Sequence, residues 1–307
     1  MGSDETGPAR DPWSQWLLHG RDAGDPQLRE TVRALVGGYV DRVLDGARLA
    51  PGQTLADIGS GEGAVALRAI ERAGPTLAVW ITDVSETMLR HAEAQALARG
   101  VRDQCSFLRC AADRLEGIPE GTIDVVTTRS VLAYVADKTA ALREFLRVLR
   151  PGGRISLAEP VMQDDALAAR AMKAVIDSKP PGQVSPLIVL LHRWKSAQYP
   201  DTEEKIRNSP LANYSERDLL RFAQTAGFTD IHLQLHIDVV PSAVRSWEAF
   251  LDSSPHPLAP PLRAIMAEQF TAEERQLFEH SMRPVVEDPK AVSTDRMAYL
   301  TARKPPA

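Results

Sequence analysis

The chain has 307 residues, of which 44% are hydrophobic and 25% charged, and its formal net charge is −5. These values are typical of a soluble globular protein and exclude the clustered basic surface that nucleic-acid binding requires. No apolar run approaches the ~20 residues of a membrane helix, and the two cysteines, Cys105 and Cys110, have no CxxC spacing, so we expect a reduced cytoplasmic protein without a membrane partner.

The N-terminal part of the chain predicts a disordered tail followed by a helical cap. Residues 1–12 are polar and lack a signal-peptide core. In residues 13–50, Trp13, Trp16 and Leu17 recur at helical spacing, and a second helix is expected over 26–46. We expect Trp13 and Trp16 to pack against the protein rather than to form a substrate cage.

Residues 51–160 alternate short apolar strands with helices. The apolar strands are nearly continuous, which is the pattern of a buried parallel sheet covered by helices on both faces. The expected strands are TLADIG, LAVWITD, CSFLRC, IDVVTT and RISLAEP, and the expected helices are 62–73, 85–99 and 137–149.

The pattern changes after Pro160. Residues 161–214 are largely helical by composition and are expected to form a lid. Residues 215–240 contain a helix and the alternating strand DIHLQLHIDVV, which predicts a sheet edge, and residues 293–305 supply a final strand. The helical insertion 241–292 lies between these strands and is expected to cover the substrate side or to form a dimer surface, so a homodimer is one interpretation.

A glycine-rich turn follows the first strand in LADIGSGEGA. Asp57, Gly59, Ser60, Gly61 and Gly63 form D-x-G-x-G-x-G. Glycines let backbone N–H groups approach a ligand, and the next helix offers its positive N-terminus. The turn also passes for a dinucleotide motif, whereas the absence of G-K-[ST] excludes a P-loop.

Asp83 ends the second strand about 20 residues later, in WITDVS. A carboxylate there can accept hydrogen bonds from two ribose hydroxyls. Both a nicotinamide enzyme and a methyltransferase use this residue type at this position. Asp83 therefore predicts a nucleoside-containing ligand without choosing between the two classes.

The order and spacing of three segments resemble the class I S-adenosylmethionine-dependent methyltransferases, most closely the bacterial small-molecule members. The segments are LADIGSGEG, ITDVSETMLRHA and IPEGTIDVVTTRSVLAYVADKTAALREFLRVLRPGGRISLAEP, and the likeness returns at GFTDIHLQL and AYLTARK. The resemblance implies an α/β fold with a doubly wound, mostly parallel, seven-stranded Rossmann-like sheet, an antiparallel last strand and added helical caps. It also implies S-adenosyl-L-methionine as cofactor and a small or medium-sized organic acceptor, with O-, N- or C-methylation in natural-product metabolism.

The resemblance also assigns roles to residues. Asp57 would orient the methionine amino group, and the backbone of Gly59, Ser60 and Gly61 would line the methionine part. Asp83 would bind the ribose. The adenine would lie beside Val84, Met88, Ala112 and Asp113, and Arg129 and Ser130 would line the junction between cofactor and acceptor.

Candidates for proton transfer are few. Tyr134 and Glu159 follow the fourth and fifth strands at the carboxyl edge of the sheet, where α/β proteins bind ligands. His19 and His192 lie on elements expected to cover that edge, although a helix-face position without chemistry fits them better. A general base is needed only for a weakly acidic nucleophile.

No metal site is expected. His232 and His236 share one strand face without a third ligand, and TTRS after the fourth strand lacks a carboxylate pattern for magnesium. Three alternatives stay open at this point: a peptide or protein methyltransferase, a nicotinamide-dependent oxidoreductase and a non-catalytic S-adenosylmethionine-binding scaffold.

Overall fold

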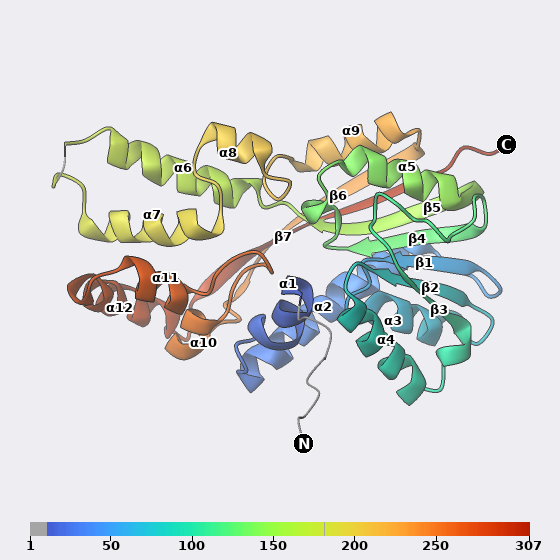
Figure 1. Ribbon diagram of the computed structural model, residues 1–307, viewed down its shortest axis with the longest axis horizontal. Helices are drawn as coiled ribbons and strands as arrows, with labels where there is room; N and C mark the ends of the chain where they lie inside the picture. The colour runs from blue at the N-terminus through green and yellow to red at the C-terminus, as the bar shows by residue number, and fades with distance from the viewer. Residues whose placement is uncertain (1–10, 181) are drawn as a thin grey trace, which may run out of the picture.

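A computed structural model describes residues 11–180 and 182–307 and contains one seven-stranded sheet (Figure 1). The strand order is β3-β2-β1-β4-β5-β7-β6. Only β7 runs antiparallel to its neighbours, β5 and β6, which confirms the predicted fold. The strands are β1 (Thr54–Ile58), β2 (Ala78–Asp83), β3 (Cys105–Arg109), β4 (Ile123–Arg129), β5 (Leu149–Pro160), β6 (Thr229–Pro241) and β7 (Val292–Arg303).

Helices cover both faces of this sheet, as the buried strands require. One apolar cluster packs α2 (Pro26–Ala47), α3 (Ala64–Ala73) and α4 (Glu86–Ala98) onto one face. A second cluster packs α5 (Lys138–Val148) and α9 (Glu216–Ala226) onto the other. The strand order reverses between β1 and β4, and ligands of such sheets bind beside that point at the carboxyl ends of the strands.

The core helices differ from the expected ranges by one or two residues at several ends, and two of these differences have a local cause. The first core helix begins at Ala64 rather than at residue 62, because Gly63 has a left-handed φ of 77° and still belongs to the turn. The helix expected over 137–149 ends at Val148, because Leu149 is extended and pairs with Ile123. The first difference lengthens the turn after β1, and the second lets β5 begin directly where α5 ends.

The remaining helices form the cap, the lid and the insertion. The cap begins with α1 (Pro12–Gln15), whose N-cap is Asp11, and a π-helical turn at Trp16–Gly20; the rest of the predicted tail, 1–10, lies outside the described residues. The lid and insertion form the end of the molecule opposite β3 and pack on each other through a third apolar cluster (Figure 1). Their helices are α6 (Gln163–Asp177), α7 (Pro186–Gln198), α8 (Glu203–Asn208), α10 (Trp247–Asp252), α11 (Leu262–Gln269) and α12 (Ala272–Val286).

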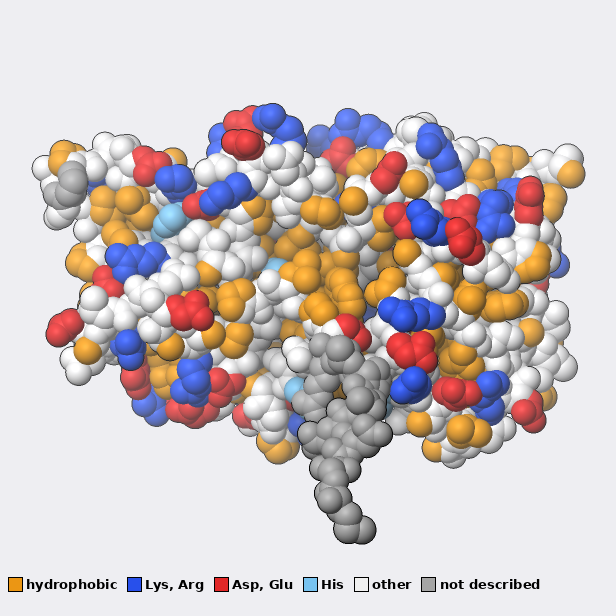
Figure 2. Space-filling view, viewed as in Figure 1, with side chains coloured by type: hydrophobic (Ala, Val, Ile, Leu, Met, Phe, Trp, Pro, Cys, Tyr) orange, Lys and Arg blue, Asp and Glu red, His pale blue; other side chains and the backbone are white. Residues whose placement is uncertain are grey.

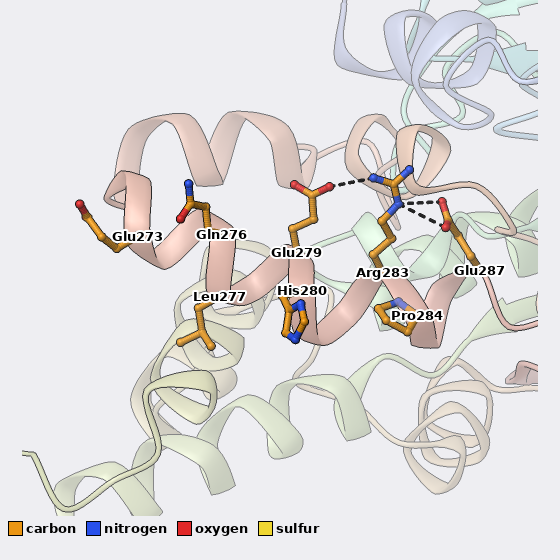
Figure 3. A pocket seen from close by; sticks show the side chains of 8 residues that line it. All are labelled: Glu273, Gln276, Leu277, Glu279, His280, Arg283, Pro284 and Glu287. Carbon is orange, nitrogen blue, oxygen red and sulfur yellow. Dashed lines mark hydrogen bonds and ion pairs between the residues drawn. The ribbon is translucent and has the colours of Figure 1, made fainter.

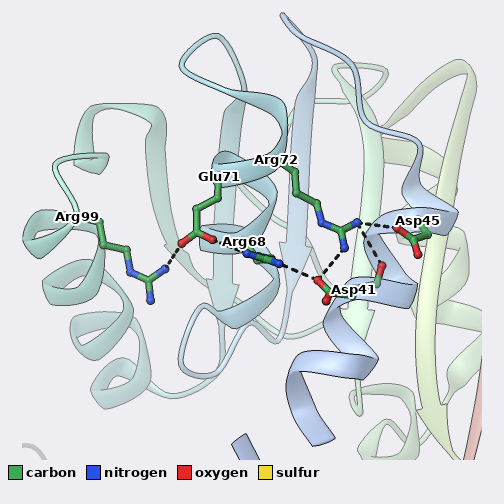
Figure 4. Close-up of polar contacts among 6 residues, drawn as sticks. All are labelled: Asp41, Asp45, Arg68, Glu71, Arg72 and Arg99. Atoms are coloured by element: carbon green, nitrogen blue, oxygen red, sulfur yellow. Dashed lines mark hydrogen bonds and ion pairs between the residues drawn. The ribbon is translucent and has the colours of Figure 1, made fainter. Parts of the chain in front are cut away.

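An exposed ion-pair network joins α2, α3 and the end of α4 (Figure 4). Asp41 accepts from Arg68 at 3.2 Å and from Arg72 at 2.7 Å, and Glu71 accepts from Arg99 at 2.8 Å. Each exposed pair contributes about 1 kcal/mol or less. The position of α2, which forms one wall of the cavity described below, therefore depends mainly on its apolar packing against the sheet, and the network adds little to it. Within the described ranges, no helix is long and apolar enough to cross a bilayer.

Candidate active site

A cavity of about 550 Å³ lies at the carboxyl ends of β1, β2 and β4, beneath the N-terminal cap. Figure 2 shows hydrophobic side chains gathered at the centre of the molecular face drawn there, between the end formed by the lid and the insertion and the part that contains the sheet. The lining comes from the cap, the sheet edge, the 253–258 loop and the start of β7. The lining residues are Trp13, Trp16, Leu17, Arg21, Val32, Leu35, Val36, Tyr39, Gly59, Gly61, Asp83, Val84, Cys110, Ala111, Ala112, Asp113, Arg129, Ser130, Val131, Tyr134, Val135, Ala136, Pro160, Met162, Pro255, Pro257, Asp295, Arg296 and Met297.

The glycine turn is held open toward this cavity by Asp83. Gly59 and Gly61 have left-handed φ angles of 62° and 54°, which glycine adopts without strain. The Gly61 N–H donates to Asp83 Oδ2 at 2.8 Å, and the Ser85 N–H donates to Oδ1 at 2.9 Å. The Asp83 side chain thus fixes the turn and faces the cavity with its remaining lone pairs.

Asp57, Met88 and Ser60 differ from the predicted ligand contacts, because the cavity lining includes none of them. Asp57 is 1% exposed, and its carboxylate accepts from the Ala66 N–H at 3.2 Å and the Thr127 hydroxyl at 2.9 Å. Burial raises the pKa of Asp57 to about 7. Asp57 lies under the turn, where its carboxylate supports the start of α3.

Met88 lies on α4, is fully buried and does not line the cavity. Ser60 is 7% exposed, and its buried hydroxyl has no hydrogen-bond partner among the described residues. The Ser60 N–H donates to the Thr82 carbonyl at 2.8 Å, so its backbone shapes the turn.

The other predicted cofactor residues line the cavity together. Val84 is 42% exposed and presents an apolar surface beside Asp83. Ala112 and Asp113 form the neighbouring wall, and Ser130, with a left-handed φ of 58°, follows Arg129 at the end of β4. Asp83, Val84 and Ser130 thus bring a carboxylate, an apolar surface and a second polar group to the same cavity, and this combination suits a nucleoside.

Arg129 is the unusual charge of this cavity. No hydrogen bond or ion pair joins its guanidinium to another residue within 11–180 or 182–307, and burial, followed by the charge of Arg21, lowers its pKa. Arg21 binds Glu62 at 2.8 Å through Nη2, while its buried Nε lacks a partner in the same ranges. The charges of Glu62 and Asp57 act on Arg129 as well, but neither forms an ion pair with it, so an anionic group in the cavity would supply the direct partner that Arg129 lacks among the described residues.

Tyr134 lines the cavity, whereas Glu159 does not. The Tyr134 ring meets Trp13 edge-on at 4.8 Å, and burial together with the charge of Glu159 raises the tyrosine pKa. The hydroxyl is therefore neutral at physiological pH and can donate a hydrogen bond, but it is a poor base.

Glu159 is wholly buried and so does not stand at the open edge of the sheet, where the sequence predicted it. Its carboxylate accepts from the Thr128 hydroxyl at 2.7 Å and from the backbone N–H groups of Val131 at 2.9 Å and Ala133 at 3.4 Å. It caps the loop after β4 from below. Glu159 is thus a positioning residue for the segment that carries Val131 and Tyr134.

Neither histidine candidate reaches the cavity. His19 is exposed on the cap. His192 lies on α7, and its Nε2 is 3.1 Å from Asp201 Oδ2. The other oxygen of the Asp201 carboxylate accepts from Lys205 Nζ at 2.8 Å. Both histidines are surface or lid residues without contact to the sheet edge, which corrects the prediction.

The cap contributes residues whose role the sequence did not indicate. Trp16 lines the cavity and donates from Nε1 to the Ser254 carbonyl at 2.9 Å, joining the cap to the insertion. Leu17 lies over the turn, since a Cβ on Gly61 would stand 3.3 Å from its Cδ1. Trp13 and Trp16 therefore enclose the cavity, contrary to the expectation that they only pack, and the one sequence signal was their position ahead of the glycine turn.

A second depression, of about 770 Å³, runs along α12 (Figure 3). All its lining residues come from this helix and its C-cap, Glu287, so no opposing wall encloses a ligand. Arg283 already binds Glu279 at 2.9 Å and Glu287 at 3.2 Å. No group of three or more metal-binding side chains occurs in the part of the chain that the structure describes.

Known proteins share both the sequence and the fold of this site. A family profile described as "Methyltransferase domain" matches residues 55–153. A nocamycin O-methyltransferase of Saccharothrix syringae is 31% identical over 278 residues, which span 87% of this chain and 90% of that protein. The chain belongs to the class I S-adenosylmethionine-dependent methyltransferases. Its cofactor is S-adenosylmethionine, and the sequence-based prediction of fold, cofactor and enzyme class is confirmed.

More distant relatives share the core. The ubiquinone/menaquinone biosynthesis C-methyltransferase UbiE of Cupriavidus metallidurans is 38% identical over 113 residues, covering 37% of this chain and 45% of that protein. A geranyl diphosphate methyltransferase in complex with S-adenosylmethionine superposes with a TM-score of 0.51 at 18% identity, covering 92% and 94% of the two chains. The [4+2]-cyclase SpnF superposes with a TM-score of 0.51 at 21% identity, covering 88% and 81%. These two structures establish the fold alone, because the fold hosts more than one reaction.

Proposed function

We propose that this methyltransferase transfers a methyl group to an oxygen atom of a small organic acceptor. The observation that carries the proposal is the relation to an O-methyltransferase along almost the whole chain, lid and insertion included. The partly open cavity of about 550 Å³ beneath the cap supports it, since pockets of ~300–1,000 Å³ suit small molecules. A peptide substrate would favour an open groove in place of a capped cavity.

The residues present fit the cofactor. The glycine turn offers open backbone near Gly59 and Gly61, Asp83 keeps free lone pairs for ribose hydroxyls, and Val84 with Ala112 offers an apolar surface for adenine. The unpartnered buried hydroxyl of Ser60 lies in the same turn. Bound S-adenosylmethionine supplies an activated methyl group on a sulfonium, so the protein has to provide alignment and exclusion of water.

The protein's own groups suit an acceptor with an acidic function. Arg129, with Arg21 beside it, would hold an anionic oxygen and orient it from the end of β4. An acceptor already ionised at neutral pH needs no general base, which agrees with the neutral Tyr134 hydroxyl and the occupied Glu159. Tyr134 would donate a hydrogen bond to the acceptor, and Trp13 and Trp16 would exclude water.

We place the enzyme in the cytoplasm, as its two free cysteines suggest, and treat it as a homodimer. The function is tested by transfer from methyl-labelled S-adenosylmethionine to panels of carboxylic acids, phenols and amines. Mass spectrometry should place the label on oxygen, and base-labile label would identify a methyl ester. A product methylated on carbon or nitrogen would contradict the proposal.

A further inference from the structure

Strand β6 leaves one long edge of the sheet without a partner. It spans Thr229–Pro241 and pairs with β7 along one side, and it ends the strand order of the sheet. Among the described residues, no other strand pairs with its outer edge. Native proteins usually protect such an edge with lysine, proline or a covering element, because free N–H and C=O groups recruit another strand. No lysine stands in β6, and its only proline is the last residue.

The same strand exposes an apolar row. Ile231 and Leu233 pack on the core, but Leu235, Ile237 and Val239, farther along the same face, are 38%, 58% and 69% exposed. Side chains two positions apart share a face of a strand, so these three form one continuous apolar stripe at the sheet margin. An apolar stripe beside an unpaired edge favours the addition of a strand with its own apolar side chains on the same face, because the two rows then pack against each other.

The sequence of β6 is complementary to itself when reversed about Leu235. In an antiparallel pair of two such strands, Leu235 faces its own copy, Leu233 faces Ile237 and Ile231 faces Val239. On the other face, Gln234 lies opposite His236, and His232 lies opposite Asp238. Between residues 231 and 239 every apolar residue therefore meets an apolar residue and Asp238 meets a histidine, and such cross-strand pairs contribute about 0.2–1 kcal/mol each. Outside this stretch the match ends, because Val240 faces Asp230 and the pairing of β6 with β7 is irregular between Thr229 and His232.

We propose that two copies of this chain associate by antiparallel pairing of β6 with the partner's β6, about a twofold axis at Leu235. A twofold axis is the commonest symmetry of soluble oligomers, and it brings the same patch of both copies together. The two seven-stranded sheets become one continuous sheet. The exposed stripes of the two copies then lie side by side and pack laterally, and the cavity stays outside the interface because none of its lining residues belongs to β6.

Sedimentation velocity of the full chain tests the association. The wild-type chain is expected to sediment with the mass of two chains. Leu235→Lys places two like charges directly opposite each other and is expected to reduce the mass to that of one chain, with S-adenosylhomocysteine affinity within about twofold of wild type as evidence of a folded site.

Leu277→Lys is the matched control, since Leu277 is 37% exposed on α12 in the helical insertion. This variant is expected to remain a dimer. A wild-type chain that is monomeric at high concentration would overturn the proposal, and so would a dimer lost in Leu277→Lys and kept in Leu235→Lys, because the insertion would then form the interface.

Cysteine crosslinking tests the register. In Leu235→Cys the two new thiols lie opposite each other, with Cβ atoms about 5 Å apart, and mild oxidation is expected to give a covalent dimer. In Ile237→Cys the copies are offset by four residues, ~13 Å along the strand, which exceeds disulfide reach. Equal crosslinking of both variants, or of neither, would overturn the pairing about Leu235.

A charge exchange provides a rescue. His232→Asp puts a carboxylate opposite the partner's Asp238 at two symmetric places and is expected to raise the dimer dissociation constant about tenfold or more. Adding Asp238→Lys restores opposite charges, and the double variant is expected to regain the wild-type dissociation constant. A dimer whose dissociation constant is insensitive to His232→Asp would contradict this register.

Discussion

Removing the charge of Arg129 is predicted to stabilise the free enzyme and to weaken its ligand binding. Arg129→Met keeps a long side chain but deletes the guanidinium that has no partner among the described residues. Apolar replacement of a buried charge gains about 1–4 kcal/mol, and this is the most that Arg129→Met can gain, because Arg129 is half-buried and the charges of Glu62 and Asp57 favour its charged form. For a chain of this size we expect Tm to rise by about 2–8 °C.

The same substitution is expected to lower ligand affinity. A hydrogen-bonded charge pair contributes about 1.5–3 kcal/mol, so binding of the anionic group should weaken by about 10- to 150-fold. Thermal unfolding without ligand and calorimetric titration with S-adenosylhomocysteine, alone and followed by acidic acceptors, measure the two effects separately.

Arg21→Met is the matched control for this experiment. Arg21 binds Glu62 at 2.8 Å, and removal of the arginine leaves that carboxylate without its partner. We therefore expect the Tm of Arg21→Met to stay level or fall. If the free Arg129→Met enzyme loses stability as Arg21→Met does, Arg129 has a structural partner and the reasoning about an anionic ligand is refuted.

Three further predictions follow from the buried acids and the cap. The pKa of Asp57 is raised to about 7, so its contribution to stability is present at low pH and is lost as the pH rises through 7. In urea titrations, the wild type should lose up to about 4 kcal/mol of unfolding free energy between pH 4 and 8 relative to Asp57→Asn. Parallel pH profiles of the two proteins would refute this. Glu159→Gln should cost about 2 kcal/mol of unfolding free energy and lower kcat through the Tyr134 loop, while unchanged stability would contradict its capping role. Trp16→Phe keeps an aromatic ring but loses the hydrogen bond to the Ser254 carbonyl. S-adenosylhomocysteine should therefore dissociate a few fold faster in stopped-flow measurements. An unchanged dissociation rate would show that the cap does not retain the cofactor.

The features that the sequence predicted correctly depend on short stretches of chain. The alternation of apolar strands and helices, the glycine turn and the acidic residue ending β2 each lie within a few residues, and their geometry follows from local backbone rules. Asp83 is the clearest case, because its contacts with Gly61 and Ser85 serve the turn that the motif describes.

The features that the sequence missed depend on partners far along the chain. Asp57 is occupied by Thr127, 70 residues away, and Glu159 by Thr128, 31 residues away, so neither carboxylate is free for chemistry. Trp16 meets Ser254 across 238 residues, which no spacing pattern encodes. Residue type alone indicates which groups can act, whereas the packing of distant segments decides which of them face the cavity.

The central claim is that the cavity above the glycine turn holds the cofactor, with Asp83 at its ribose. A crystal structure of the complex with S-adenosylhomocysteine tests it most directly. The account predicts ribose hydroxyls within hydrogen-bond distance of the Asp83 carboxylate and the amino-acid end beside Gly59 and Gly61. Ligand density in another part of the molecule, or a ribose that does not touch Asp83, would contradict it.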